Sequence, residues 1–378
     1  MPSVYLAGVA AAIAFGKFVP LSASMRGELE LSFTSFEWLV SIVMVVAATL
    51  GLPVGIWLRR HDAHRALIAG LCVMGAAGAV QALTTDVPLL YFERVVEGAG
   101  YLVVVVTGPL LLSRAVTDEA EAAWLALWST FLPVGLAIAS LGGALEGVVG
   151  WRTTVSLASV PAFVAVVGLL LFRRGDPVRG ARVAGSMDAF SAELWLALAF
   201  ALAASLGISL LAIVPALAES HDVQGVAVGL TTAVVALAGV PGSIVASALL
   251  KRGHRLARLV ATGAVMPLAA AFVFWSRSWS VAAVATAVIL FVDGVLLATM
   301  YAAVPLVARG RLERAYGALV QAGSLGALLG PPLFGVVVAT AGWGPGVPLI
   351  AAFTAGAIGA FYVCRAHVAA ARPGNGGQ

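Results

Sequence analysis

Apolar runs long enough to cross a bilayer recur along this chain and limit its fold more than any other feature. Hydrophobic residues make up 61% of the 378 residues and charged residues only 11%, whereas a soluble domain carries about 25% charge. Lipid accommodates only helices or closed barrels, and these runs do not alternate as barrel strands do. We therefore predict an all-α membrane protein with twelve transmembrane helices, at residues 4–23, 36–58, 66–83, 88–112, 123–148, 153–172, 194–218, 226–250, 256–275, 281–307, 316–341 and 347–364.

Basic residues are distributed unequally between the two sides of these spans. With the N-terminus placed in the cytosol, 17 of the 22 lysines and arginines fall in cytosolic segments and two lie within spans. The remaining three, Arg26, Arg152 and Arg277, fall outside. Because cytoplasmic loops of membrane proteins carry an excess of basic residues, we predict that the N- and C-termini are both cytoplasmic.

The chain repeats several landmarks after 188 to 196 residues, which indicates a duplication. A Gly-x-Pro sequence at 51–53 recurs at 239–241, Val-Pro at 19–20 recurs at 214–215, and Gly-Trp at 150–151 recurs at 342–343. Parallel halves with a substrate site between them at the membrane midplane are a known transporter plan. We therefore predict an N-terminal six-helix half at 1–172, a cytosolic linker at 173–193, a C-terminal six-helix half at 194–364 and a cytosolic tail at 365–378.

Two acidic residues occupy matching frames in the two halves. Glu97 and Asp293 are each followed at once by glycine and twelve residues later by proline. A carboxylate inside a bilayer is costly unless it faces a wet or paired interior. When a cationic partner can move, such a carboxyl group loads and releases a proton, so both acids are candidates for proton coupling. For Glu97 an alternative stays open, because Arg94 three residues earlier could neutralise it permanently.

Two basic residues, Lys17 and Arg94, also lie inside spans, about one turn nearer the outer surface than the acids. An ammonium group buried here needs an acceptor, so Lys17 is a candidate for binding an anion or for coupling. Its alternative is a structural role as the partner of Asp293 or Glu97. Arg94 is a candidate either for substrate contact or for helix packing. Tyr101, on the same helix face as Arg94 and Glu97, and Gln321 in the eleventh span complete the predicted substrate-binding set.

Two motifs resemble those of the major facilitator superfamily. The fourth span contains Arg-x-x-x-Gly-x-Gly at residues 94–100, and the eleventh contains Gly-x-x-x-Gly-Pro at 326–331. The size and short loops are similar to those of bacterial cyanate and nitroimidazole transporters. The resemblance implies two six-helix bundles with spans 1, 4, 7 and 10 around a central cavity, in a bacterial inner (plasma) membrane.

The loop after the second span departs from the family pattern Gly-x-x-x-Asp-Arg-x-Gly-Arg-Arg. Arg59 stands where the pattern has aspartate, and Asp62 stands where it has glycine. The gate lock that the pattern implies is therefore altered. We expect Asp62 to pair with Arg114, after the fourth span, as a substitute gating contact.

These features predict a secondary active transporter that works by alternating access with proton coupling. A small organic or inorganic anion is the favoured solute, because Lys17 and Arg94 converge at one depth. The alternative is a proton-coupled exporter of hydrophobic or cationic drugs, in which Glu97 and Asp293 attract the cation. No complete Walker motif, CxxCH or HExxH occurs, so we expect no enzyme activity, no cofactor and no metal. The expected partners are the solute, protons and the lipid bilayer, with no nucleic acid. We expect a monomer, because one chain contains both halves.

Overall fold

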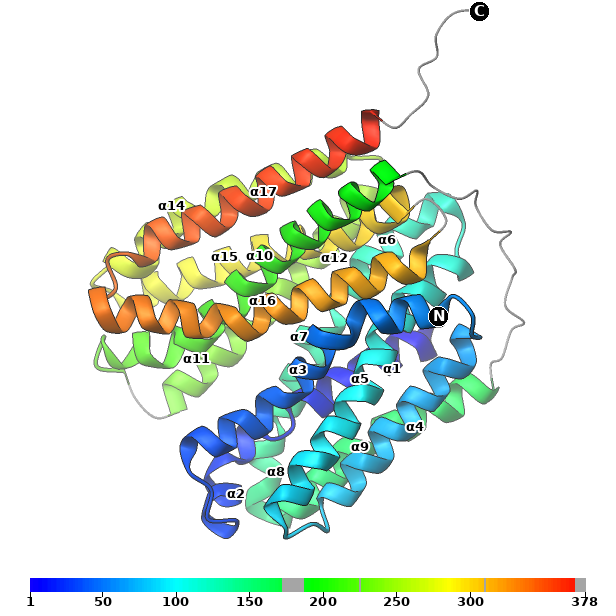
Figure 1. Cartoon of the computed structure of the whole chain (residues 1–378). Coiled ribbons are helices and arrows are strands. Elements are labelled where there is room, and N and C mark those ends of the chain that lie inside the picture. Colours follow the sequence, from blue (N-terminus) through cyan, green and yellow to red (C-terminus); the bar gives the residue numbers. More distant parts are fainter. Residues whose placement is uncertain (172–186, 224–225, 309–310, 371–378) are drawn as a thin grey trace, which may run out of the picture.

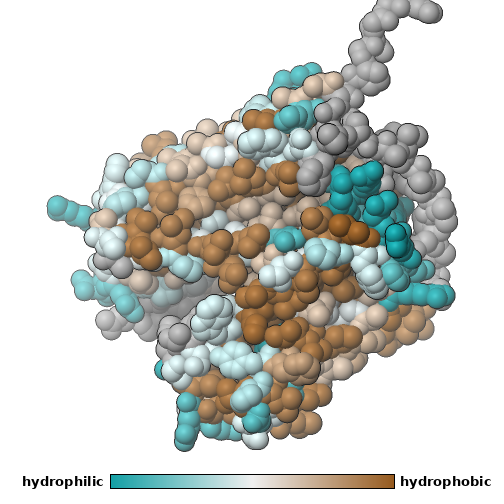
Figure 2. Space-filling view, in the orientation of Figure 1, coloured by the Kyte–Doolittle hydropathy of each residue, from teal (hydrophilic) through white to brown (hydrophobic). Residues whose placement is uncertain are grey.

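The computed structural model of the chain describes residues 1–171, 187–223, 226–308 and 311–370. Twelve helical segments within these ranges are long and apolar enough to cross a membrane, and each coincides with one of the predicted spans. The prediction of an all-α membrane protein is therefore confirmed. Hydrophobic residues cover the middle of the molecular surface, while hydrophilic residues gather toward its two ends (Figure 2). This distribution is the one expected of a protein whose middle faces lipid.

The helices form two bundles, the first from α1–α9 and the second from α10–α17 (Figure 1). The first bundle consists of α1 (Pro2–Gly16), η1 (Val19–Leu21), α2 (Ser22–Glu28), α3 (Phe33–Leu58), α4 (Ala63–Gln81), α5 (Val87–Ala115), α6 (Asp118–Trp128), α7 (Phe131–Ser140), α8 (Gly142–Val149) and α9 (Trp151–Leu171). The second consists of α10 (Met187–Glu219), α11 (Val226–Leu237), α12 (Gly239–Lys251), α13 (Leu256–Ala261), η2 (Thr262–Val265), α14 (Met266–Trp275), α15 (Trp279–Ala308), α16 (Leu312–Ala341) and α17 (Gly346–Ala370).

Two helices extend past the boundaries predicted for the C-terminal half, one at each end of that half. α10 begins at Met187, inside the segment predicted as linker, because neither proline nor glycine interrupts the chain between there and Gly207. α17 continues to Ala370, past the predicted end of the second half at residue 364. Residues 172–186 of the predicted linker and 371–378 of the predicted tail lie outside the described residues.

Prolines interrupt three of the spans in the same way. Proline lacks the N–H group that would bond the carbonyl four residues earlier, and its ring clashes with that carbonyl. Pro20 follows the end of α1 at Gly16 by four residues, and Pro241 follows the end of α11 at Leu237 by four. Pro133 follows Ser129, the C-terminal cap of α6, by four residues, where α6 gives way to α7. The first, fifth and eighth spans are therefore each broken just before a proline.

The two bundles approach each other most closely on the side where α1 begins and α17 ends, which we call the terminal side. Here α3 of the first bundle lies beside α16 of the second (Figure 1). A β-carbon added at Gly55 would lie only 2.4 Å from the carbonyl oxygen of Glu313 and 3.0 Å from the α-carbon of Gly317. The absence of side chains lets the two backbones meet, as small residues do at other helix crossings in membranes.

Gly55→Ala tests this contact. The added methyl group must push α3 away from α16, and overpacking of this kind costs about 1–3 kcal/mol. We expect a lower midpoint of thermal unfolding for the detergent-purified variant. Gly335→Ala is the matched control, because a β-carbon at Gly335 of α16 meets nothing within 4 Å. Equal midpoints for the two variants would show that the close approach at Gly55 carries no energetic weight.

Candidate functional site

A cavity of about 150 Å³ lies between the two bundles and is lined by residues from both of them. The first bundle contributes residues of α3, α5 and the α6–α7 break, and the second contributes residues of α10, α11, α12, α15 and α16. Two of the predicted site residues, Tyr101 and Asp293, line this cavity, whereas Lys17, Arg94, Glu97 and Gln321 do not. The structure thus separates residues that the sequence had grouped into one site.

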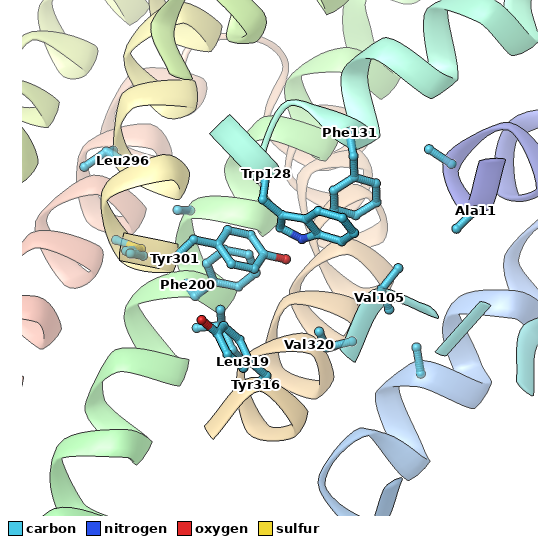
Figure 3. Packing of buried hydrophobic residues seen from close by; sticks show 14 of the residues in the cluster. Ala11, Val105, Trp128, Phe131, Phe200, Leu296, Tyr301, Tyr316, Leu319 and Val320 are labelled. Atoms are coloured by element: carbon cyan, nitrogen blue, oxygen red, sulfur yellow. The ribbon is translucent and has the colours of Figure 1, made fainter. Parts of the chain in front are cut away.

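Aromatic rings form much of the cavity wall. Phe200 of α10 and Tyr301 of α15 meet edge to face, with ring centroids 5.2 Å apart. Phe131 of α7 also lines the cavity and packs against the buried Trp128, with centroids 4.8 Å apart. In Figure 3 the hydroxyl group of Tyr301 points toward Trp128, so the aromatic cluster extends across the two bundles. Faces of such rings attract cations as well as apolar groups.

Asp293 is the only charged residue among the described residues that line this cavity. Its side chain is 4% exposed, and its Oδ1 atom has no hydrogen-bond partner in the described part of the chain. Removing an ionised carboxylate from water costs several kcal/mol unless a compensating charge accompanies it. The site therefore suits a proton or a cationic group on Asp293.

Glu97 lies in a separate polar cluster inside the first bundle. Its Oε1 atom accepts a hydrogen bond from Lys17 Nζ at 2.6 Å, and its Oε2 atom accepts from Arg94 Nη1 at 2.5 Å. Gln81 of α4 donates from Nε2 to the same Oε2 atom at 3.0 Å. Of the two partners that the sequence left open for Lys17, the structure supplies Glu97. The cluster holds two cations and one anion, all at most 2% exposed.

Arg94 uses all five of its N–H groups in this cluster. α1 ends at Gly16, so its last carbonyl groups have no helical donors, and Arg94 donates to two of them. Its hydrogen bonds run to Glu97 Oε2 and to the carbonyl oxygens of Ala14, Phe15, Leu39 and Val40. Since a guanidinium group has five N–H donors, none is left for a solute. Arg94 joins α1, α3 and α5 and fits the packing interpretation.

The two predicted gating residues do not form the contact expected of them. Asp62 caps the N-terminus of α4, where its Oδ1 accepts from the backbone N–H of Arg65 at 2.8 Å, a role that suits aspartate. Arg114, at the end of α5, instead forms an ion pair with Glu313 at the start of α16. This ion pair joins the two bundles on the terminal side.

Hydroxyl groups add two further links between the bundles. Ser129, at the α6–α7 break, donates to Ser243 of α12 across 2.9 Å. Ser247, one turn later on α12, donates to the carbonyl oxygen of Ala123 across 2.8 Å. The Ser129–Ser243 bond lies in the wall of the cavity, and the Ser247 bond and the Arg114–Glu313 pair connect the bundles elsewhere.

Gln321 lies at the seam between α16 and α3 rather than in the cavity. Its Oε1 atom accepts from the backbone N–H of Leu52 at 2.8 Å, and its Nε2 atom donates to the carbonyl oxygen of Thr49 at 3.5 Å. Both of these groups belong to α3, so Gln321 also connects the two bundles.

Several functional residues were missed by the sequence analysis. Tyr301 follows Asp293 by eight residues, a spacing that places both on one helix face and could have revealed it. Glu313 is the acidic residue in a basic segment, a weaker signal. Three further acids are buried near span ends: Glu93, bonded to Thr84, Glu121, bonded to Ser113, and Glu193, paired with Arg314.

Comparison with known proteins identifies related sequences and folds. Residues 4–308 match the family described as the Major Facilitator Superfamily. A 147-residue stretch is 26% identical to the methylenomycin A resistance protein of Bacillus subtilis (strain 168), and this match spans 38% of the chain and 31% of that protein.

Two solved structures share the fold over nearly the whole chain. The human organic anion transporter MFSD10 (TETRAN) superposes with a TM-score of 0.72 at 14% identity, covering 96% of this chain and 98% of its own. The proton:xylose symporter XylE, bound to 6-bromo-6-deoxy-D-glucose, superposes with a TM-score of 0.76 at 12% identity, covering 96% and 94%. At these identities the likeness concerns the fold alone.

The charge balance of the Glu97 cluster predicts unequal effects of two substitutions. Glu97→Gln leaves Lys17 and Arg94 facing each other without their shared anion, whereas Lys17→Met leaves the Arg94–Glu97 pair intact. Breaking a buried pair so that a charge is uncompensated costs about 3–5 kcal/mol. We expect Glu97→Gln to lower the thermal midpoint of the purified protein more than Lys17→Met does. The opposite order would contradict the assigned pairing.

Proposed function

The chain belongs to the major facilitator superfamily and is a membrane transporter; we propose that it exports a hydrophobic or cationic solute in exchange for protons. The observation that carries this proposal is Asp293, a buried carboxyl group in an aromatic-lined cavity between the two bundles. The proposed site consists of Asp293 with Tyr101, Phe131, Phe200 and Tyr301.

The composition of the cavity wall supports a lipophilic cation. Apolar and aromatic side chains provide contact area for the hydrophobic part of a solute, and aromatic faces stabilise a positive charge by about 0.5–2 kcal/mol. Asp293 supplies the opposite charge. None of the described residues that line the cavity is a lysine or an arginine, so a bound anion would face a carboxyl group without a compensating cation.

The anion hypothesis rests on Lys17 and Arg94, and both are engaged elsewhere. Lys17 donates a hydrogen bond to Glu97, and Arg94 donates to Glu97 and to backbone carbonyl groups. Freeing either cation for a solute would break a buried pair, which costs about 3–5 kcal/mol. We therefore prefer the exporter. The partial similarity to a protein named for resistance to methylenomycin A agrees with this preference. The similarity to the organic anion transporter concerns the fold alone and does not oppose it.

Competition between a proton and a cation on Asp293 provides the coupling. Only differential binding of ligands to two conformations can shift their populations. When Asp293 releases a proton, its carboxylate attracts the cationic solute, and protonation from the other side of the membrane expels that solute. We propose Asp293 as the proton-coupling residue and assign Glu97 to the rigid interior of the first bundle.

Alternating access requires the closed terminal side to open. We propose that the chain sits in a bacterial plasma membrane with both termini in the cytoplasm, so the closed side is cytoplasmic. The two halves, at 1–172 and 194–364, then rock about the cavity, and the Arg114–Glu313 pair acts as a gate contact that must separate in each cycle. One chain contains both halves, so we expect it to work as a monomer.

Asp293→Asn tests the proposal, because the amide keeps the size of the side chain and loses the titratable charge. In proteoliposomes with an imposed pH gradient, we expect the variant to move ethidium, a planar aromatic cation, at about one tenth of the wild-type rate or less. An unchanged thermal midpoint would show that the variant is folded. Asp222→Asn, on an exposed turn, is the matched control and should transport normally.

A thermal-shift comparison separates the two solute classes. A ligand that binds the folded state raises its midpoint by mass action, so ethidium should stabilise the protein and benzoate, a small aromatic anion, should not. Stabilisation by benzoate alone, lost on Lys17→Ala, would restore the anion hypothesis and overturn the exporter.

A further inference from the structure

We infer that Gln321 is a positioning residue of the gate: its side-chain amide occupies a gap in α3 that Pro53 creates, and thereby latches the two bundles together on the terminal side. This role goes beyond the identity of the solute, since it concerns the equilibrium between the closed and open conformations. It also replaces the solute contact expected of Gln321 from the sequence.

The gap follows from the chemistry of proline. Pro53 lies inside α3, and it has no N–H group to donate to the carbonyl four residues earlier, which is that of Thr49. Thr49 is exposed and lies within the membrane-spanning segment Trp38–Leu58. In a bilayer no water replaces the missing donor, and an unsatisfied backbone group there is costly.

Gln321 of the other bundle supplies what α3 lacks. Its Nε2 atom donates to the Thr49 carbonyl at 3.5 Å, the longer of its two contacts, and its Oε1 atom accepts from the Leu52 N–H at 2.8 Å. A primary amide is suited to this position because it offers a donor and an acceptor on one planar group. One side chain therefore contacts α3 on both sides of the interruption.

The position of Gln321 is fixed by the close approach of the helices. A β-carbon on Gly51 would lie 2.7 Å from the Gln321 β-carbon and 2.8 Å from the carbonyl oxygen of Gly317. Glycine at 51 thus brings the amide within reach of the α3 backbone. Gln321 follows Glu313 by eight residues, which places the two side chains on one face of α16. Gln321 connects α16 to α3, and Glu313 connects α16 to α5 through Arg114, so both contacts hold the bundles together at different levels.

Opening of the terminal side must remove this amide from α3. The Thr49 carbonyl and the amide of Gln321 then both lose their partners within the membrane-spanning part of the two helices. This loss destabilises the open conformation relative to the closed one, just as a ligand that binds only the closed conformation would. Gln321 therefore raises the fraction of molecules in the closed conformation when no solute is bound.

Distance measurement between spin labels tests this inference directly. Arg60, after α3, and Arg255, before α13, are exposed on the terminal side of different bundles, and each is replaced by cysteine in a Cys72→Ala, Cys364→Ala background. Gln321→Leu removes both hydrogen bonds. Without solute, we expect the open-to-closed ratio to rise on the order of five- to tenfold, the equilibrium shift that corresponds to one lost hydrogen bond.

A second substitution distinguishes the latch from simple packing. Pro53→Ala restores the N–H group that can bond the Thr49 carbonyl, whereas the Leu52 contact is lost in either background. Gln321→Leu should therefore change the ratio less in the Pro53→Ala background than in the presence of Pro53. An equal shift in both backgrounds, or none in either, overturns the inference. If Gln321→Leu does not fold, Gln321→Asn is used, since its shorter side chain cannot reach Thr49. These readouts contain no solute, so failure of the exporter proposal would leave them unaffected.

Discussion

The first bundle depends on the two ion pairs that the carboxylate of Glu97 forms with Lys17 and Arg94. One carboxylate holds an ammonium and a guanidinium group that would otherwise repel each other in a medium of low dielectric. Through Arg94 the same cluster satisfies the carbonyl groups where α1 ends. The side chains of Lys17, Gln81, Arg94 and Glu97 thereby join the end of α1 with α3, α4 and α5, and the bundle can move as one body.

The second bundle has a different electrostatic character. Its carboxyl group at the matching position, Asp293, borders the cavity and keeps an oxygen without a partner among the described residues. The two acids that occupy matching positions in the sequence, Glu97 and Asp293, thus lie in different environments. In the first half the acid stabilises the interior, and in the second half it is available to what enters the cavity. A scaffold whose charged groups are all paired, beside one carboxyl group with an unpartnered oxygen, is a suitable arrangement for a site that must bind and release.

Sequence reasoning predicted the spans because their signal is composition over about twenty residues, which packing does not alter. The three helix ends near proline follow from equally local chemistry. Pairings of polar side chains could not be obtained in this way, because they depend on the rotation of each helix about its axis and on its neighbours. The sequence left Glu97 and Asp293 as possible partners of Lys17, and only the packing of the helices shows that the partner is Glu97. Arg114 was predicted as a gate residue with Asp62 as its partner, but the structure pairs it with Glu313, which is distant in sequence and became evident only from the crossing of α5 and α16.

The division of charge between the two bundles has a consequence for how this protein could diversify. Substitutions at Phe200, Tyr301 or Asp293 alter the chamber without touching the ion cluster that assembles the opposite half. The cavity wall can therefore change one residue at a time while the ion cluster of the first bundle stays intact, because the two are built from separate groups of side chains.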